Sequence, residues 1–164
     1  MPSYRRGRPE TNFAFPYSET VLRRGKTYLP MAEAALSWKG QPASYAMLVD
    51  TGAESSFVTP EMASLLELES GEERWVYPIG QRFKARASRV RIQLVSASGG
   101  RSAPQMLDVL IPEDEDLLEI PILGRIPFLD WYELTLRNWK RELVLRERVP
   151  PARIVGKEFV ARTR

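Results

Sequence analysis

Apolar and polar residues alternate in short runs along much of the chain, and this pattern predicts β-strands. Val90, Ile92 and Leu94 alternate with charged or polar neighbours, as in a strand with one face in solvent. Residues 44–49 (SYAMLV) are apolar on both faces, which predicts a strand that is buried on both sides. The runs at residues 27–38, 105–112 and 134–147 predict two further strands and a hairpin.

A helical start is predicted at Thr59. This residue can cap a helix, Pro60 suits its first position, and Glu61 suits its positive end. The apolar residues that follow supply a short face for burial: Met62, Leu65, Leu66 and Leu68. Further along, two strand-like runs flank residues 78–81 (PIGQ), which predicts a hairpin with Gly80 at its tip. The chain is therefore expected to be mainly β, with one or two short helices.

The two ends of the chain differ in composition from the part between them. Residues 1–26 are rich in arginine, proline and polar groups and show no period, so we expect a basic flexible arm. The chain is basic and irregular again over residues 149–164, which we expect to form a C-terminal tail. Residues 27–148 remain as one domain, which suits a chain of 164 residues that is 43% hydrophobic.

The expected location follows from segments that the sequence lacks. No apolar run is long enough to span a bilayer, and no apolar segment follows the positive charges near the N-terminus. The chain also has no cysteine, which fits a reducing compartment. We therefore expect a cytoplasmic protein with no membrane contact.

The composition excludes several kinds of chemistry. Without histidine or cysteine the chain has no Ser/His or Cys/His nucleophile and no zinc site of the usual type. The acidic run at residues 113–119 is expected to be a solvated loop, because no glycine turn with spaced ligands indicates a calcium site. No metal or other cofactor is therefore expected. The net charge is +3, and the basic residues gather at the ends, where solvated tails explain them better than nucleic-acid binding.

One aspartate stands where a buried strand is predicted to end. Ala46, Met47, Leu48 and Val49 lead directly into Asp50-Thr51-Gly52-Ala53 (residues 46–53). An ordinary turn aspartate would explain this pattern, and so would a carboxylate that activates water. Two carboxylates about 3 Å apart share one proton, so that one acts as a base and the other as an acid. Such a pair needs neither histidine nor metal, and the glycine lets a backbone N–H approach the carboxylate.

Three segments, in this order, resemble the retropepsin-like aspartic proteases, the single-lobed relatives of pepsin. They are residues 48–66 (LVDTGAESSFVTPEMASLL), residues 75–85 (WVYPIGQRFKA) and residues 120–136 (IPILGRIPFLDWYELTL). The resemblance covers roughly residues 27–147, most of the chain. It implies a closed β-barrel, equivalent to half of a two-lobed acid protease, and the hydrolysis of peptide bonds in a polypeptide substrate.

The resemblance also implies a role for individual residues. Asp50 would be the catalytic aspartate, Thr51 would link the two active-site turns, and Gly52, followed by Ala53, would hold the carboxylate in plane. The flap tip over the substrate would consist of Ile79, Gly80 and Gln81. Gly124 would leave room for the active-site loop to cross behind Asp50. Glu54 and Arg125 match the positions of a supporting ion pair in viral members.

The sequence contains a single Asp-Thr-Gly and no Asp-Ser-Gly, whereas the chemistry needs two carboxylates. The simplest solution is a twofold homodimer with one Asp50 from each chain at the axis. Two hypotheses of function follow: an active aspartic endopeptidase, or a weakly active or inactive module that binds peptide or protein partners. The intact motif favours the endopeptidase. A nucleic-acid-associated role for the arginine-rich ends is a weaker third hypothesis.

Overall fold

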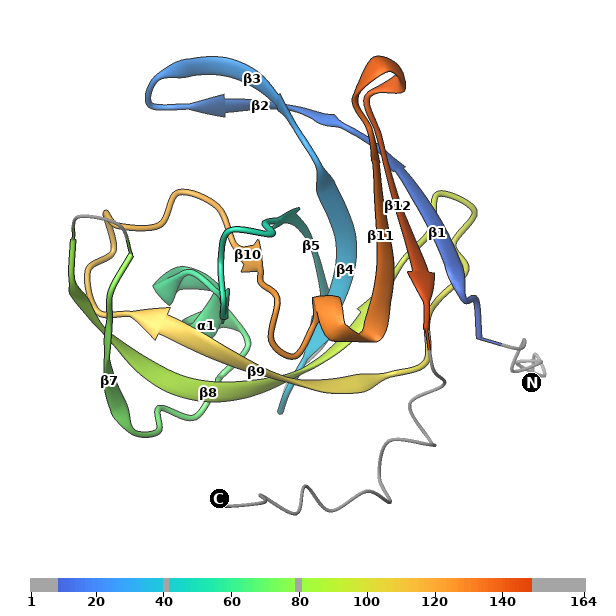
Figure 1. Ribbon diagram of the computed structural model, residues 1–164. Helices are drawn as coiled ribbons and strands as arrows, with labels where there is room; N and C mark the ends of the chain where they lie inside the picture. Colours follow the sequence, from blue (N-terminus) through green and yellow to red (C-terminus); the bar gives the residue numbers. More distant parts are fainter. Residues whose placement is uncertain (1–8, 40–41, 79–80, 149–164) are drawn as a thin grey trace, which may run out of the picture.

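The computed structural model of the protein describes residues 9–39, 42–78 and 81–148, and strands dominate it (Figure 1). Strands account for 52% and helical segments for 9%, so the prediction of a mainly β protein is confirmed. Within the described ranges, no helix has the length and apolar character that crossing a membrane requires.

The main sheet closes on itself as a barrel. Its strands follow the order β4 (Met31–Ser37), β5 (Ala43–Val49), β10 (Ile122–Leu123), β6 (Ser56–Phe57), β9 (Gln105–Pro112), β8 (Phe83–Leu94) and β7 (Glu73–Val76). An additional pairing of β4 with β8 closes six of these strands, and β7 extends outward from β8 as a hairpin. The predicted retropepsin-like barrel is therefore confirmed.

The inward residues of the strands form one main core. On β8, Val90, Ile92 and Leu94 are buried, as their alternation predicts. The strand β5 differs from its prediction, because only Met47 and Val49 are buried while Ala46 is exposed and Leu48 is half-buried. Apolar residues on both faces therefore did not mean burial on both faces, since β5 has the core on one side only.

The helix α1 (Pro60–Leu65) follows β6 and begins as predicted. The hydroxyl of Thr59 accepts a hydrogen bond from the amide of Met62 at 3.2 Å. Met62 and Leu66 are buried, but Leu65 is 69% exposed, so it does not belong to the predicted apolar face. The helix spans less than two turns, and its buried residues Met62 and Ala63, together with Leu66 at its C-terminal cap, anchor it to the barrel.

A second sheet lies beside the barrel and contains a strand that the sequence analysis did not predict. Its order is β1 (Asn12–Pro16), β12 (Glu142–Glu147) and β11 (Tyr132–Arg137). The short 3₁₀-helices η1 (Leu129–Trp131) and η2 (Asn138–Lys140) lie before and after β11. Phe13 and Phe15 of β1 are buried and pair in antiparallel register with Leu145 and Leu143. The predicted hairpin of β11 and β12 is present.

The expected flexible arm over residues 1–26 is therefore wrong for the described residues from Asn12 onward. Two alternating phenylalanines are enough to fix β1 against β12, although arginine and proline dominate the composition around them. A two-stranded hairpin follows, made of β2 (Ser18–Leu22) and β3 (Gly25–Leu29). Residues 149–164, where a basic tail was expected, lie outside the described residues.

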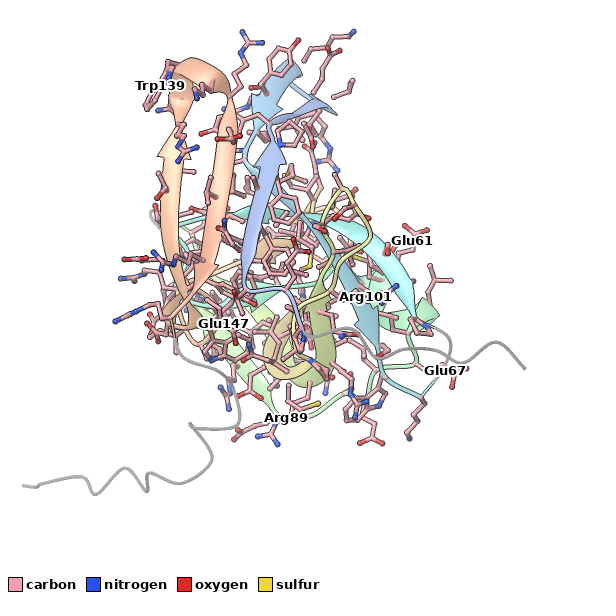
Figure 2. The ribbon with its side chains drawn as sticks, turned by 90° about the vertical axis from the view of Figure 1, so that its right-hand side faces the viewer. Glu61, Glu67, Arg89, Arg101, Trp139 and Glu147 are labelled. Atoms are coloured by element: carbon pink, nitrogen blue, oxygen red, sulfur yellow. The ribbon has the colours of Figure 1, made fainter. Side chains whose placement is uncertain are left out.

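Glu147 at the end of β12 makes the stability of the fold dependent on pH. Burial raises the pKa of Glu147, and one of its carboxylate oxygens is buried without a hydrogen-bond partner among the described residues. Figure 2 shows Glu147 at the opposite end of the β11–β12 hairpin from Trp139. A raised pKa in the folded state favours folding at acid pH, and this contribution is lost as the pH rises and the carboxylate ionises.

We expect Glu147→Gln to raise the melting temperature near neutral pH and to change it little near about pH 3.5, where the carboxyl is protonated in both states. The reason is that glutamine at this position carries no charge to be buried. Thermal unfolding followed by circular dichroism at both pH values measures the effect. Glu133→Gln, an exposed position on the neighbouring strand β11, is the control. An equal gain at both pH values would contradict the charge argument.

Candidate active site

Asp50 lies directly after β5, at one end of the barrel, and its own turn holds it there. Its backbone amide donates a hydrogen bond to the carbonyl of Leu123 at 3.1 Å, which ties it to β10. The amide of Gly52 donates to Oδ1 of the Asp50 carboxylate at 2.8 Å. The amide of Ala53 donates to the Asp50 carbonyl at 3.3 Å and closes the turn. The carboxylate is half-buried and oriented by the backbone rather than by a neighbouring side chain.

Glycine at position 52 lets the turn approach the carboxylate closely. A Cβ at this position would lie 3.1 Å from Asp50 Oδ1, tighter than ordinary contact, so a side chain would push the carboxylate away. Thr51 and Gly52 are both exposed, and the Thr51 hydroxyl makes no hydrogen bond with another described residue. The turn therefore presents its outer edge to solvent.

The chain crosses behind this turn at Gly124. The strand β10 lies between β5, with which it is parallel, and β6, with which it is antiparallel. A Cβ at position 124 would overlap the carbonyl oxygen of Ser55 and lie 3.0 Å from that of Ala53. The amide of Gly124 donates to the hydroxyl of Ser56 at 3.0 Å, and Ser56 is completely buried. Only glycine fits this crossing.

Ser56 is a positioning residue that the sequence analysis missed. Its side chain satisfies the buried amide of Gly124, an atom that would otherwise have no partner at the crossing. The signal in the sequence is weak, because a serine six residues after the aspartate is expected in any polar turn. Its role becomes visible only when β10 is placed next to β6.

Glu54 and Arg125 come together through their backbones and not through their side chains. The amide of Arg125 donates to the carbonyl of Ala53 at 2.9 Å, and the amide of Ile126 donates to that of Glu54 at 2.8 Å. Both side chains are exposed, and they form no salt bridge with each other in the described part of the chain. The expected ion pair is therefore absent from the single chain, while the two backbone bonds hold these segments side by side.

The hairpin of β7 and β8 occupies the position of the expected flap. Phe83 lies opposite Val76 in the last strand pair before the tip, and its ring lies 6.0 Å from that of Phe57, which joins this part of the hairpin to β6. Lys84 forms an ion pair with Glu73 at 2.8 Å, and this hydrogen bond lowers the pKa of Glu73. The ring contact therefore attaches the hairpin to the barrel at β6, and the ion pair joins the two strands of the hairpin to each other.

Toward the tip, the hairpin exposes aromatic residues. Trp75 is 46% and Tyr77 is 71% exposed, and the guanidinium of Arg82 lies 5.0 Å from the centre of the Trp75 ring. Gln81 is exposed, and its amide donates to the carbonyl of Pro78 at 3.1 Å. Ile79 and Gly80, the other two residues of the expected flap tip, lie outside the described residues.

Two grooves open on the surface of the described residues. One, of about 720 Å³, is bordered in part by Glu54, Ser55, Ile126 and Pro127, and Asp50 is not among its lining residues. The other, of about 620 Å³, lies between the start of α1 and the acidic loop 113–119. Among the described residues, no three or more acidic side chains converge closely enough to hold a metal ion.

A single-lobed barrel with one Asp-Thr-Gly turn, crossed at the glycine that follows β10, is typical of the retropepsin-like fold. The family model for aspartyl proteases matches residues 34–125, more than half of the chain. The protein therefore belongs to the aspartyl protease family, and its fold is retropepsin-like.

Solved structures with a similar fold include two retropepsins. A retropepsin-like aspartic protease from Rickettsia conorii is 16% identical, with a TM-score of 0.50, covering 85% of this chain and 96% of that chain. The EIAV protease in complex with the inhibitor HBY-793 is 19% identical, with a TM-score of 0.45, covering 62% of this chain and 86% of that chain. No curated protein sequence matches the chain.

Proposed function

We propose that the protein is an aspartic endopeptidase that acts as a homodimer. The observation that carries this proposal is the turn of Asp50, which is oriented by the Gly52 amide at 2.8 Å and presented at the surface. One such turn occurs in the chain, so a second copy would supply the second carboxylate. The exposed edge at Thr51 is where the partner's turn would meet it.

The paired carboxylates would share one proton and divide the chemistry between them. The ionised Asp50 takes a proton from water as the water oxygen attacks the carbonyl carbon of the peptide bond. The protonated Asp50 of the other chain gives its proton to the carbonyl oxygen, which forms a neutral tetrahedral intermediate. The Asp50 that took the proton from water then gives it to the nitrogen while the other Asp50 takes a proton from one hydroxyl of the intermediate. The C–N bond breaks, a carboxylic acid and an amine are released, and the pair again carries one proton.

The surrounding elements would position the polypeptide substrate. An extended peptide would lie between the Asp50 turn and the β7–β8 hairpin, with Ile79, Gly80 and Gln81 over it as the flap tip. Exposed Trp75 and Tyr77 on the same hairpin offer apolar area for substrate side chains. Arg125 and Glu54 support the turn through their backbone hydrogen bonds.

Incubation of the purified protein with a peptide library, with products identified by mass spectrometry, tests the proposed activity. Cleavage at defined sites by the wild-type protein supports an endopeptidase. Peptide binding without cleavage would support instead the alternative function, a binding module that keeps the fold.

We expect the protein to form a twofold homodimer in solution and to lose specific activity on dilution below the dissociation constant. The reason is that one chain supplies one Asp50, so a separated chain has only half of the acid–base pair. Sedimentation equilibrium measures the association, and activity over the same concentrations tests the link. A strictly monomeric protein with full activity would contradict the shared site.

A further inference from the structure

The β2–β3 hairpin starts beside the strand that carries Asp50. Pro30 follows β3 directly, and its carbonyl accepts a hydrogen bond from the amide of Val49 at 2.9 Å. On the other edge of β5, the carbonyl of Pro121 accepts from the amide of Leu48 at 2.8 Å. The segments that lead into β4 and β10 therefore flank the end of β5 from opposite sides, with Asp50 between them.

The tip of the same hairpin reaches the segment on the opposite side. Arg23 lies between β2 and β3, and its backbone amide donates to Glu119 Oε2 at 3.0 Å. Its guanidinium donates to Asp116 Oδ1 at 3.0 Å and lies 3.5 Å from Glu119 Oε1. Glu119 comes two residues before Pro121, so the hairpin extends from the β4 side of Asp50 to the β10 side. Figure 1 shows it arching over the side of the barrel where β5 ends.

The base of the hairpin is attached more firmly than its tip. The guanidinium of Arg141, from the β11–β12 turn, lies 4.0 Å from the centre of the Tyr28 ring. Tyr17, just before β2, donates its backbone amide to the carbonyl of Arg141 at 2.6 Å and its hydroxyl to Asn138 Oδ1 at 2.7 Å. These contacts fix the end of the hairpin that lies next to β11 and β12.

The tip is held by exposed charges. The side chains of Arg23 and Asp116 are 62% and 87% exposed, and that of Glu119 is 34% exposed. Exposed ion pairs are weak and are screened by salt. Within the hairpin, Lys26 pairs with Glu19 at 2.8 Å, and this bond does not involve the acidic loop. Loss of the Arg23 contacts would therefore free the tip while the hairpin itself stays paired.

We propose that the β2–β3 hairpin is an autoinhibitory strap that arches over the side of the barrel where β5 ends, held at its tip by the contacts of Arg23 with Asp116 and Glu119. The strap leaves Thr51 and Gly52 exposed to solvent, but it stands in the path of a second copy of the chain, and it moves aside when that copy docks. This inference rests on the proposed homodimer. It adds a mechanism by which the hairpin hinders dimerisation of the separated chain. Because salt weakens the ion pairs of Arg23, higher ionic strength would shift the equilibrium from monomer toward dimer.

The position of the strap can be measured without any protease assay. The chain has no cysteine, so Arg24→Cys on the tip and Glu115→Cys on the acidic loop introduce two unique sites for spin labels. Labelled chains are diluted into an excess of unlabelled chains, and the distance between the labels is measured by pulsed electron paramagnetic resonance. We expect one short distance at low salt and a longer, broader distribution at high salt or with Arg23→Glu.

The consequence for assembly is measured by sedimentation equilibrium. We expect Arg23→Ala to tighten dimerisation about threefold to tenfold, since two exposed ion pairs no longer compete with the partner. Adding Glu119→Arg to Arg23→Glu should restore both the short label distance and the weaker association. Lys26→Ala, which removes an exposed cation from the same hairpin but none of the contacts of Arg23, should change neither.

The two readouts separate this proposal from the proposed function. A dimer that forms equally in all variants, or a label distance that does not respond to Arg23→Glu, would overturn the strap while leaving the homodimer intact. A strap that opens in a protein that stays monomeric at every concentration would overturn both the homodimer and the gating role.

Discussion

Replacing Asp50 with asparagine is expected to lower the rate of peptide cleavage by at least about a thousandfold, because the variant has lost its proton-transferring groups. Asparagine has nearly the same shape as aspartate, and its side-chain oxygen can still accept the Gly52 amide bond that measures 2.8 Å in the wild type. The turn should therefore keep its geometry while the acid–base chemistry disappears. Cleavage of a library-selected peptide measures the loss, and circular dichroism checks the fold.

The matched control for this variant is Asp130→Asn. Asp130 is exposed, its side chain makes no hydrogen bond or salt bridge with the described residues, and it lies after β10 rather than in the active-site turn. We expect this substitution to leave the activity at the wild-type level. Wild-type turnover in Asp50→Asn would disprove the assignment of Asp50, and an equal loss in both variants would point to a general effect of charge.

The strands and the turn could be predicted from the sequence because their signals are local, whereas the closed barrel was implied by the resemblance to the retropepsin-like proteases. The alternation of Val90, Ile92 and Leu94 is strong enough to predict which face of β8 is buried. The cap of α1 depends on Thr59 and Pro60, which are adjacent in sequence, and it forms as expected. Asp50, Thr51 and Gly52 form their turn within three residues, so the pattern of residues and the geometry coincide.

The features that could not be predicted depend on partners that are distant in the sequence. Phe13 of β1 pairs with Leu145, and the residues around Phe13 in the arginine-rich start of the chain do not indicate this partner. Ser56 became a positioning residue only because β10 returns to lie between β5 and β6. Arg23 contacts Asp116 and Glu119 across more than ninety residues of chain. The composition of residues 1–26 and of residues 113–119 had indicated instead that these charges are solvated.

The Glu54–Arg125 pair illustrates a different limit. The resemblance to viral retropepsins placed the two residues correctly next to each other, since hydrogen bonds join Arg125 to Ala53 and Ile126 to Glu54. It also implied an ion pair, which their exposed side chains do not form in the single chain. In this chain the backbone brings the two segments together, whereas a contact between the side chains depends on their local surroundings.

Replacing Gly124 with alanine is expected to destabilise the fold by about 3 kcal/mol or more, which is at the upper end of the cost of overpacking. The added methyl group would overlap the carbonyl oxygen of Ser55, and this oxygen belongs to backbone that cannot rotate away. Relief of the overlap would require the turn of Asp50 and the strand β10 to separate, which would break the bond of 2.9 Å from the Arg125 amide to Ala53. Urea unfolding of the variant and the wild type measures the difference.

Gly99→Ala is the control that separates the effect of the collision at Gly124 from the general cost of replacing a glycine. Gly99 has a φ of +84° and nothing within 4 Å of an added Cβ, so alanine there adds backbone strain of about 1 kcal/mol without any collision. If Gly124→Ala is destabilised no more than Gly99→Ala, the crossing is looser than its geometry indicates, and glycine is not required behind the turn. If the loss at position 124 is several times larger, the segment that follows the Asp50 turn is held against β10 by the close approach of Gly124 to the carbonyls of Ser55 and Ala53, which leaves no room for a side chain.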